Sequence, residues 1–550
     1  MQLLLLSGLI VMMQIPALSG CRGSDPASVV SSIVAGDIIP TVYPSDTVRN
    51  IKELGIKEGD YIRKNRGSFT YKGNSGHEEP SLVISPYYTL SIDGQEIPVY
   101  STIVYVGTDG ECALQSFSII ELRDTIDVDI DVALTAQRYP LENAVVLPES
   151  RNVEPVIDGD IVRASISDYG NYSFLMNDED NEVSQYNAFT LFVREYVDED
   201  EEIAGLKAEY GEANVTIYES GTHLFDYINI ENDNTVVYLR RGALLVTNGN
   251  PEYGEKNQYT EPGAKYSNGW GLERFPVITA NGRKNIRITG GGAIDAGQLG
   301  WHERKGIMIT FCTDVEISGI TLMNFPDWTI TTYCSSEIDI HDVAIFGYKT
   351  NSDGFAICNS KNAVIRDCFA RSGDDLFEVK TLGGSYDATS ENVRFQDCVA
   401  WASKARAFGV IAEVTKNISD IVFKDCAVII RDSTWNNEIL GSLVVFCSEG
   451  NGAVSDVTFE NVEIYQDDGR AINVSIGNES LKRTQIRNIR FKNISYRSAL
   501  PNKLGTMDTE TNNVQVIFEN VRSGDVLLTD ENADQHFIKD DFCELIFEIS

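Results

Sequence analysis

The chain has 550 residues, of which 42% are hydrophobic and 9% aromatic, so it is a folded protein that is too long for one ordinary core. Its formal net charge of −37 argues against nucleic acid and anionic membrane surfaces as partners, because both attract clustered Lys and Arg. An acidic polysaccharide stays open, since only the charge at the binding site matters there. The ten cysteines contain no CxxC pair and the five histidines are scattered, so we expect neither a metal site nor a cofactor.

The first 20 residues are predicted to be an export signal, because the apolar stretch Leu3–Met13 is followed by small residues. The stretch Leu18–Cys21 resembles a bacterial lipoprotein signal, which is cleaved before a cysteine that then carries lipid. A plain signal peptide is the alternative. Lipid on Cys21 would anchor the protein to a membrane without a spanning segment. We therefore expect an exported protein, either an outer-membrane lipoprotein of the cell envelope or a secreted one, with residues 21–35 as a linker.

Residues 36–213 carry the signals of strands and turns. The segment Thr125–Val132 alternates polar and apolar residues with period 2, as a half-buried strand does, and similar runs occur before it. We predict an N-terminal β-sandwich-like domain, with one short helix at Ile51–Ile56. The acidic run Asp198–Glu202 is predicted to be a solvated loop near the domain junction, with a cation site as the alternative.

From residue 214 to 525 one template recurs: an apolar alternation, a Gly, Asp or Asn, and a second short apolar alternation. Examples are Val315–Leu322, Ile338–Ile345 and Ala363–Ala370, and successive copies start 23 to 36 residues apart. No copy has the 3.6-residue period of a helix, so each copy predicts short strands joined by a polar turn. Stacked coils of two or three strands describe a parallel β-helix, and the predicted fold class is all-β. Residues 526–550 are interpreted as a C-terminal tail.

Three cysteines occupy the same template position in consecutive coils: Cys368, Cys398 and Cys426. Stacking of the coils predicts that they form an internal ladder of buried thiols, a core role that suits Cys. A disulfide within the ladder is the alternative to unreactive packing.

Three carboxylates in the repeat region, Asp353, Asp374 and Asp375, lie 21 and 22 positions apart in two turn sequences. Because neighbouring coils are about 4.8 Å apart, one shared corner of the β-helix would bring the three side chains together. Like charges raise one another's pKa, and this cost is met more often at functional sites than in a scaffold. Such a cluster could hydrolyse a glycosidic bond with inversion, where carboxyl groups are about 6.5–9.5 Å apart, or it could hold Ca²⁺.

The stretches Asn351–Gly354 (N-S-D-G) and Gly373–Asp375 (G-D-D) resemble the N-T-D-G and (Q/G)-D-D motifs of glycoside hydrolase family 28, the polygalacturonases and their relatives. The layout also resembles the related family 49, the dextranases and isopullulanases, which place a β-sandwich-like domain before the β-helix. The resemblance implies a right-handed parallel β-helix and an inverting hydrolase. It further implies that Asp374 is the general acid, while Asp353 and Asp375 position and deprotonate the water.

Two other family 28 motifs are absent. The G-H-G motif aligns with Ala407-Phe408-Gly409, preceded by Arg406, so its histidine is missing. The basic R-I-K motif is missing from the next coil, where Gly441–Phe446 is apolar. Because the resemblance implies that those residues bind uronate, both departures argue against ordinary polygalacturonase activity and leave the three aspartates unaffected.

Four further residues near the aspartates are predicted to bind substrate: Asn351, Lys380, Arg406 and Trp328. Trp328 could stack on a sugar or pack within a loop. Lys380 and Arg406 could bind hydroxyl or carboxylate groups, or be solvated surface charges. Residues 345–410 contain eight Lys or Arg and eight Asp or Glu, a balance that favours an anionic or partly anionic glycan when the whole chain has a charge of −37.

Three functions fit these observations. The first is an inverting glycoside hydrolase that cleaves a polysaccharide. The second is a polysaccharide lyase on the same scaffold, which would need Ca²⁺ and a basic residue such as Lys380 or Arg406 to take the proton next to a uronate carboxyl. The third is a surface glycan-binding protein without catalysis, since a fold alone does not fix a function. Clustered acids argue against this third function, because binding alone does not need them.

Overall fold

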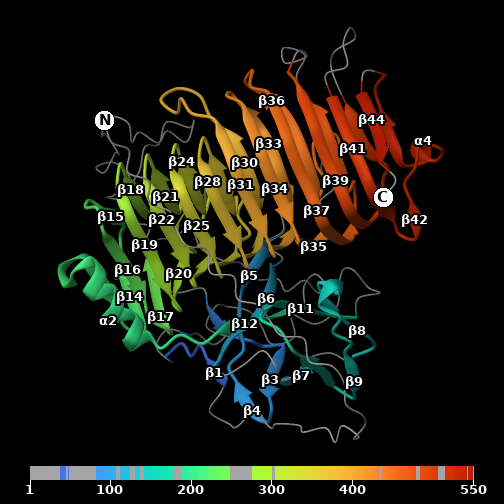
Figure 1. The fold of residues 1–550 in the computed structure, drawn as a ribbon. Coiled ribbons are helices and arrows are strands. Elements are labelled where there is room, and N and C mark those ends of the chain that lie inside the picture. The colour runs from blue at the N-terminus through green and yellow to red at the C-terminus, as the bar shows by residue number, and fades with distance from the viewer. Residues whose placement is uncertain are drawn as a thin grey trace, which may run out of the picture.

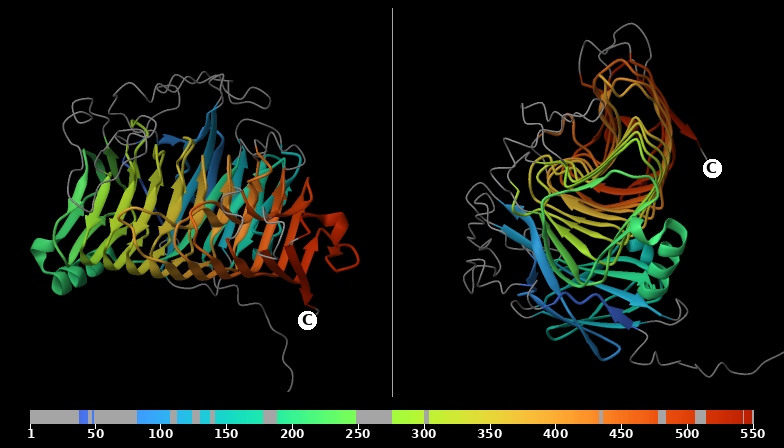
Figure 2. Two further views of the ribbon diagram at one scale, coloured as in Figure 1. Left: turned by 90° about the horizontal axis from the view of Figure 1, so that it is seen from above. Right: turned by 90° about the vertical axis from the view of Figure 1, so that its left-hand side faces the viewer.

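The computed structural model places a β-sandwich beside a long β-helix (Figures 1 and 2). The predicted signal peptide with Cys21, the linker 21–35 and the predicted helix at Ile51–Ile56 lie outside the described residues. No helix within the described ranges is long and apolar enough to cross a membrane. The structure describes residues 38–44, 48, 82–106, 112–123, 130–136, 141–177, 188–247, 276–299, 304–432, 436–477, 484–505, 514–541 and 543–548.

The N-terminal part confirms the predicted β-sandwich-like region. Two sheets enclose one apolar core, to which Leu134 contributes from one sheet and Phe174 from the other. The first sheet consists of β1 (Ile38–Pro40), β2 (Val83–Ile84), β5 (Tyr100–Val106), β6 (Cys112–Leu122), β8 (Ala144–Leu147), β11 (Gly170–Met176) and β12 (Phe189–Glu195). The second consists of β3 (Tyr88–Ile92), β4 (Gln95–Ile97), β7 (Ile130–Ala136), β9 (Val156–Asp158) and β10 (Ile161–Ile166). A short 3-10 helix, η2 (Glu149–Arg151), follows β8.

The acidic run Asp198–Glu202 begins a helix, so its prediction as a solvated loop is wrong. Asp198 is the N-cap of α2 (Glu199–Tyr210), and its side chain accepts hydrogen bonds from the backbone N–H groups of Asp200 and Glu201. The carboxylates of the first turn also lie at the positive end of the helix dipole. Ile203 and Tyr210 bury the other side of α2 against the first coils of the β-helix. The local acidic pattern is therefore a helix start.

The β-helix has three strands in most coils and confirms the predicted architecture. One 11-stranded parallel sheet takes the last strand of each coil: β15 (Ile228–Ile230), β18 (Ile278–Asn281), β21 (Ile307–Thr310), β24 (Ile330–Tyr333), β27 (Phe355–Cys358), β30 (Phe377–Thr381), β33 (Phe408–Val414), β36 (Leu443–Glu449), β38 (Ile472–Ile476), β40 (Asn502–Gly505) and β43 (Phe537–Lys539).

The other strands form a 21-stranded sheet that bends within each coil at the polar template residue. A 3-10 helix, η3 (Glu212–Asn214), precedes it. Its strands are β13 (Val215–Tyr218), β14 (Gly221–Phe225), β16 (Thr235–Leu239), β17 (Ala243–Thr247), β19 (Lys284–Gly290), β20 (Ala293–Asp295), β22 (Thr313–Ser318), β23 (Thr321–Met323), β25 (Ser336–His341), β26 (Ala344–Phe346), β28 (Lys361–Arg366), β29 (Phe369–Ser372), β31 (Ser390–Gln396), β32 (Val399–Ala402), β34 (Ile418–Lys424), β35 (Ala427–Arg431), β37 (Val454–Asp467), β39 (Ile486–Ser498), β41 (Val514–Ser523), β42 (Val526–Leu527) and β44 (Cys543–Glu548).

The polar template residue turns the chain between the two strands of each repeat. Asp342, Asp367, Asp397 and Asp425 all have φ between 51° and 55°, in the left-handed region. Asp and Asn tolerate this conformation better than other residues with a side chain, which explains why the template uses them or Gly. The recurring residue is therefore a backbone requirement of the coil.

Stacked side chains fill the interior of the β-helix. Five phenylalanines stand one above another with ring centroids 4.7–5.2 Å apart: Phe395, Phe423, Phe459, Phe491 and Phe518. The predicted ladder of Cys368, Cys398 and Cys426 is confirmed, because all three are buried free thiols on neighbouring coils. Each coil repeats the same interior contact, so the repeats align closely there.

The β-helix continues beyond residue 525, so the interpretation of 526–550 as a tail is wrong. After a short helix, α4 (Ala533–His536), strand β43 pairs in parallel with β40, and β44 pairs in parallel with β41. Phe537 and Cys543 are buried in the same core as the earlier coils. The sequence departs from the repeat template here, but the strands of the preceding coil still pair with two further strands.

The sandwich docks on the strands that follow the polar turn in each coil (Figure 2). Phe117 of β6 stacks on Phe346 of β26, with ring centroids 4.9 Å apart. Buried Arg371 of β29 donates to Gln115 of β6 at 2.9 Å. The described strands of the 11-stranded sheet take no part in the sandwich core, although Tyr348 in the loop before β27 packs against it. The aspartates lie at that sheet.

Candidate active site

Five residues occupy equivalent places in consecutive coils, at the edge of the 11-stranded sheet where its strands begin. The first buried residues of β21, β24, β27, β30 and β33 are register neighbours. The residue two positions before each one forms what we call the edge row: Lys305, Trp328, Asp353, Asp375 and Arg406. The residue after each of the first four row members donates its backbone N–H to the carbonyl oxygen of the next member, at 2.7–3.0 Å. This ladder fixes the spacing of the row.

The structure brings the three predicted aspartates together. One carboxylate oxygen from each of Asp353, Asp374 and Asp375 lies within 4.8 Å of the others. Asp353 and Asp375 are only 2% and 3% exposed, whereas Asp374 is half-buried. Asp353 and Asp375 belong to the edge row, and Asp374 stands beside it. Of the three, Asp374 therefore reaches the surface most, and the cluster could also bind one divalent cation.

Backbone groups hold the Asp374 carboxylate from two sides. The N–H of Asn351 donates to Oδ2 at 3.0 Å, and the N–H of Asp375 donates to Oδ1 at 3.1 Å. Asn351 adopts a left-handed conformation with φ 65°, which turns its N–H toward the next coil. The structure thus brings Asn351 to the site through its main chain, and a contact of its side chain with substrate stays a prediction.

Arg406 pairs with Asp375. Its Nη1 is 2.8 Å from Asp375 Oδ2, its backbone N–H donates to Oδ1 at 3.1 Å, and its Nε donates to the carbonyl oxygen of Ile439. Both charges are buried, so Arg406 is not a solvated surface charge. The guanidinium instead fixes the orientation of one carboxylate of the cluster.

Lys380 is surrounded by three carboxylates. Its Nζ lies 3.0 Å from Glu378, 3.4 Å from Glu413 and 3.5 Å from Asp353. Glu378 and Lys380 both point outward from β30, because Phe377 and Val379 between and beside them point into the core. Lys380 is therefore a buried partner of the catalytic candidates and, like Arg406, is not solvated.

Burial and mutual repulsion change the acidity of the cluster. Burial, Glu378 and Asp374 raise the pKa of Asp353 well above its usual value. Burial and the neighbouring Asp375 raise the pKa of Asp374 to about 6. Burial also raises the pKa of Glu378 to about 8, although Lys380 opposes the shift. The cluster therefore retains protons near neutral pH, as a site with a general acid requires.

Trp328 contacts two ammonium groups. Lys305 Nζ lies 3.5 Å from the centroid of the Trp328 ring, and Lys380 Nζ lies 4.3 Å from it. Lys305 also pairs with Asp327 at 3.2 Å. These cation–π contacts place the half-buried ring beside Asp353, and the prediction that it stacks on a sugar stays open to test.

Sequence reasoning missed Glu378, Glu413 and Lys305 at this site. A signal for Glu378 was present, because it alternates with Phe377 and Val379 and must share the outer face of the strand with Lys380. Lys305 carries no such signal, since only the register of β21 against β24 places it in the edge row. The motif alignment also pointed to Phe408, which is buried in the core and stacks on Phe377, whereas Arg406 occupies the edge row.

Among the described residues one other tryptophan occurs, Trp401, and it does not extend the site. Trp401 is fully buried, with the Arg371 guanidinium 3.8 Å from its ring centroid, on the side that meets the sandwich. The remaining three, Trp270, Trp301 and Trp435, lie outside the described residues. Strand β36 (Leu443–Glu449) carries no Lys or Arg, in agreement with the missing basic motif.

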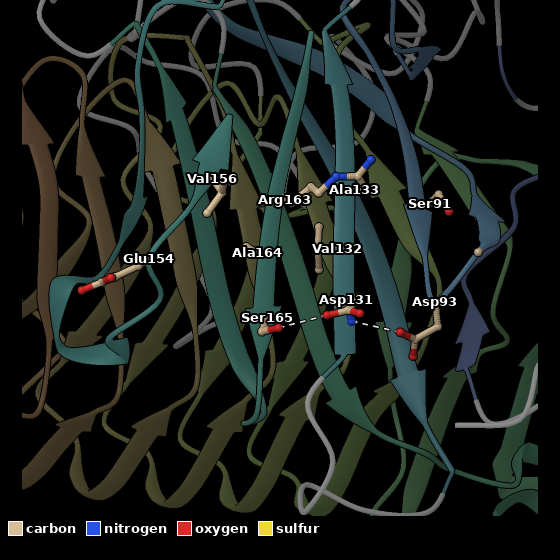
Figure 3. A pocket seen from close by; sticks show the side chains of 11 residues that line it. Ser91, Asp93, Asp131, Val132, Ala133, Glu154, Val156, Arg163, Ala164 and Ser165 are labelled. Carbon is tan, nitrogen blue, oxygen red and sulfur yellow. Dashed lines mark hydrogen bonds between the residues drawn. The ribbon is translucent and has the colours of Figure 1, made fainter. Parts of the chain in front are cut away.

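A separate open pocket of about 530 Å³ lies on the exposed face of β3, β7 and β10 in the sandwich (Figure 3). Asp93 accepts from the backbone N–H of Asp131 at 3.0 Å, and Asp131 accepts from the Ser165 hydroxyl at 3.0 Å. None of the predicted site residues lines this pocket.

Comparison with known proteins places the repeat region in a family. Residues 263–534 match Glycosyl hydrolases family 28. The structure resembles Dex49A from Penicillium minioluteum with a TM-score of 0.54 and 13% identity, over 87% of this chain and 96% of that one. The repeat region therefore matches family 28 over just under half of the chain, and the likeness to Dex49A is a likeness of fold. The likeness to Dex49A includes the β-sandwich, since it extends over most of both chains.

Curated relatives match only parts of the chain. A probable polygalacturonase from Vitis vinifera is 29% identical over 28% of this chain and 36% of its own length. Polygalacturonase QRT2 from Arabidopsis thaliana is 22% identical over 42% of this chain and 55% of its own length. The chain thus spans about a third to a half of the length of these two relatives.

Proposed function

We propose that the protein is an inverting O-glycosyl hydrolase that cleaves a polysaccharide. The observation that carries the proposal is the cluster of Asp353, Asp374 and Asp375, whose oxygens lie within 4.8 Å of one another on two adjacent coils. The match of the repeat region to family 28 supports the reaction class. The polygalacturonase names of the relatives support a polysaccharide as the substrate.

Asp374 is the general acid in this proposal. It is the most exposed carboxyl of the cluster, and burial together with Asp375 raises its pKa to about 6. A carboxyl with such a pKa still carries a proton in mildly acidic solution and can give it to the glycosidic oxygen. Hydrogen bonds from the main chain at Asn351 and Asp375 fix the direction in which it does so.

Asp353 and Asp375 hold the attacking water in this proposal. Lys380 and Arg406 orient these two carboxylates. Both aspartates are almost fully buried and are less exposed than Asp374. Inversion rests on the family 28 and 49 motifs, because separations within 4.8 Å are shorter than the roughly 6.5–9.5 Å of typical inverting pairs. A retaining reaction would instead need Asp353 or Asp375 to attack the sugar directly, and the anomer that is released first distinguishes the two reactions.

The lyase alternative loses support at Lys380. Burial acts to lower the pKa of Lys380, but Glu378, Glu413 and Asp353 outweigh burial and raise this pKa well above its usual value. A lysine that stays charged cannot take a proton next to a uronate carboxyl. Arg406 is likewise held in an ion pair, with Asp375. A purely glycan-binding protein would have no need of the buried acid cluster.

Asp374→Asn tests the proposal. The variant keeps the size of the side chain and should lose about 10²–10⁴-fold in the release of reducing ends from a polysaccharide panel. An unchanged unfolding temperature would show that the fold is intact. Substantial remaining activity would refute the role of Asp374, and proton NMR of the first-formed anomer distinguishes inversion from retention. Absorbance near 235 nm that disappears with chelator would support a lyase instead.

We also propose that the protein is exported and that Cys21 carries lipid, on the strength of the Leu18–Cys21 sequence. Expression with and without Cys21→Ser in a Gram-negative host tests this. The unchanged protein should fractionate with membranes and incorporate labelled fatty acid, and the variant should do neither. Equal behaviour of the two would leave a plain signal peptide as the explanation.

A further inference from the structure

Three cations beside the aspartates already face carboxylates of the protein itself. Lys380 faces Asp353, Glu378 and Glu413 within 3.5 Å. Lys305 pairs with Asp327, and Arg406 pairs with Asp375. The equal numbers of acidic and basic residues in 345–410 predicted a site suited to an anionic glycan, but the structure gives each of these three cations a carboxylate partner.

The neighbouring coils add no cation at the equivalent outward positions. On β27 these positions hold Ala356 and Cys358, one coil before Glu378 and Lys380. On β33 the position next to Glu378 is Gly409, which is followed by Val444 on β36. The edge row likewise continues from Arg406 to Gly441, two residues before the first residue of β36. A uronate carboxylate bound over these coils would meet apolar or small residues. The next member of the edge row is Arg470, which again faces a carboxylate, that of Glu438 at 3.4 Å.

Two acceptor oxygens near the catalytic aspartates have no hydrogen-bond donor among the described residues, Asp353 Oδ1 and Glu378 Oε1. Glu378 Oε2 and Glu413 Oε2 instead face the Lys380 ammonium, at 3.0 and 3.4 Å. An oxygen that lacks a donor favours a ligand that brings an O–H group and disfavours one that brings another carboxylate. Glu413 is 25% exposed, so this side of the Lys380 cluster is open to a ligand.

We infer that the sugar bound over the aspartate cluster carries no carboxylate, so the substrate is a neutral glycan. Glu378 and Glu413 determine this specificity, because they face the Lys380 ammonium at 3.0 and 3.4 Å and occupy the place that a uronate carboxylate would otherwise take. The inference rests on the proposed hydrolase function and names the substrate class of the same site. It differs from what the names of the polygalacturonase relatives suggest.

A matched pair of polymers tests the charge preference. Polygalacturonate and the galactan obtained by reducing its carboxyl groups differ only at C6, and a set of neutral glucans and galactans widens the search for the sugar. We expect the best neutral polymer to be cleaved on the order of a hundredfold faster than any uronate polymer, because like charges in a desolvated site repel strongly. Faster cleavage of a uronate polymer would overturn the inference.

The Glu378→Gln/Glu413→Gln variant tests the residues. It keeps the side-chain shapes and leaves Asp353, at 3.5 Å, as the one carboxylate facing Lys380 among the described residues, so the ratio of uronate to neutral binding should rise by about tenfold or more. Glu460→Gln is the matched control, because it removes the carboxylate partner of Lys492 at 3.1 Å on β37, outside the 11-stranded sheet. A folded double variant with an unchanged ratio would overturn the role of the two glutamates.

Binding to the Asp374→Asn variant separates this inference from the proposed function. Calorimetry with neutral and uronate oligosaccharides reports the charge preference without turnover, and neutral binding should be almost insensitive to salt between about 0.02 M and about 0.5 M. If neutral oligosaccharides bind while the unchanged protein releases no reducing ends from any polymer, the hydrolase proposal fails and the inference stands. Tighter binding of uronates, weakened by salt, overturns the inference.

Discussion

Two groups of acidic residues in this protein differ in their surroundings more than in their composition. In the sandwich pocket, Asp93, Asp131 and Glu154 are exposed, and two of them accept hydrogen bonds from neighbours in the same sheet (Figure 3). At the edge row, Asp353 and Asp375 are buried and each pairs with a buried cation. Both places therefore contain carboxylates, and the two groups differ in how far they are buried.

The difference shows what converts an acidic group into a candidate active site. Water screens and solvates exposed carboxylates, so their separation has little energetic consequence. Buried carboxylates interact strongly with one another and with cations, which shifts proton affinities and fixes side-chain directions. The acidic start of helix α2 is a third case, in which the carboxylates serve the backbone of the helix.

The largest expected effect comes from neutralising one carboxylate in each group. Asp375→Asn should lower the turnover by about 10²–10⁴-fold, because in the proposed mechanism it removes a group that holds and deprotonates the water. Asp93→Asn in the sandwich pocket should leave turnover unchanged. Rates of reducing-end release from one polysaccharide, measured at equal concentrations of folded protein, compare the two. Equal losses would mean that the sandwich pocket belongs to the catalytic machinery.

A smaller effect is expected when the cation of an ion pair is replaced. Arg406→Met leaves the buried Asp375 charge without its partner and should lower the free energy of unfolding by about 3–5 kcal/mol. Arg163→Met removes the exposed ion pair with Asp158, in which the charged atoms are 3.5 Å apart. This variant should change the free energy of unfolding by about 0–1 kcal/mol. Urea unfolding of both variants gives the comparison. Similar values would show that burial does not strengthen the edge-row pair.

The pH dependence of the rate gives the most graded test. Since burial and Asp375 raise the pKa of Asp374 to about 6, the protonated acid is present below about pH 6 and is lost as the pH rises. The value of kcat/KM should therefore fall about tenfold per pH unit above that point. Asp93→Asn should show the same profile. A profile that stays flat from about pH 5 to about pH 8 would contradict the role of Asp374.

Most of the fold could be predicted from the sequence, because a β-helix repeats its chemistry. The apolar alternation and a left-handed Asp, Asn or Gly recur from coil to coil, so each copy supports the same interpretation. The ladder of Cys368, Cys398 and Cys426 follows from that repeat. The last coil was missed because its sequence departs from the template, and helix α2 was missed because its acidic start resembles a solvated loop.

The site could be predicted only in part. Asp353, Asp374 and Asp375 were found because two motifs and the repeat period placed them on adjacent coils. The motif alignment set Phe408 at the position of the missing histidine, and Phe408 is buried in the core, because an alignment cannot tell which residues of a short segment point outward. The partners Glu413 and Lys305 lie in other coils, and their distance from the aspartates depends on strand register and loop course.

The sequence by itself determined the all-β architecture, the stacking of the coils and the identity of the three aspartates. These properties follow from local patterns that repeat along the chain, where each coil contacts only its neighbours. The tertiary structure alone decided which charges meet. Lys380 and Arg406 could bind substrate, face solvent or pair with acids as far as the sequence shows, and burial in one cluster makes them partners of Asp353 and Asp375. Electrostatic interactions depend on distance and solvent exposure, which no local pattern contains.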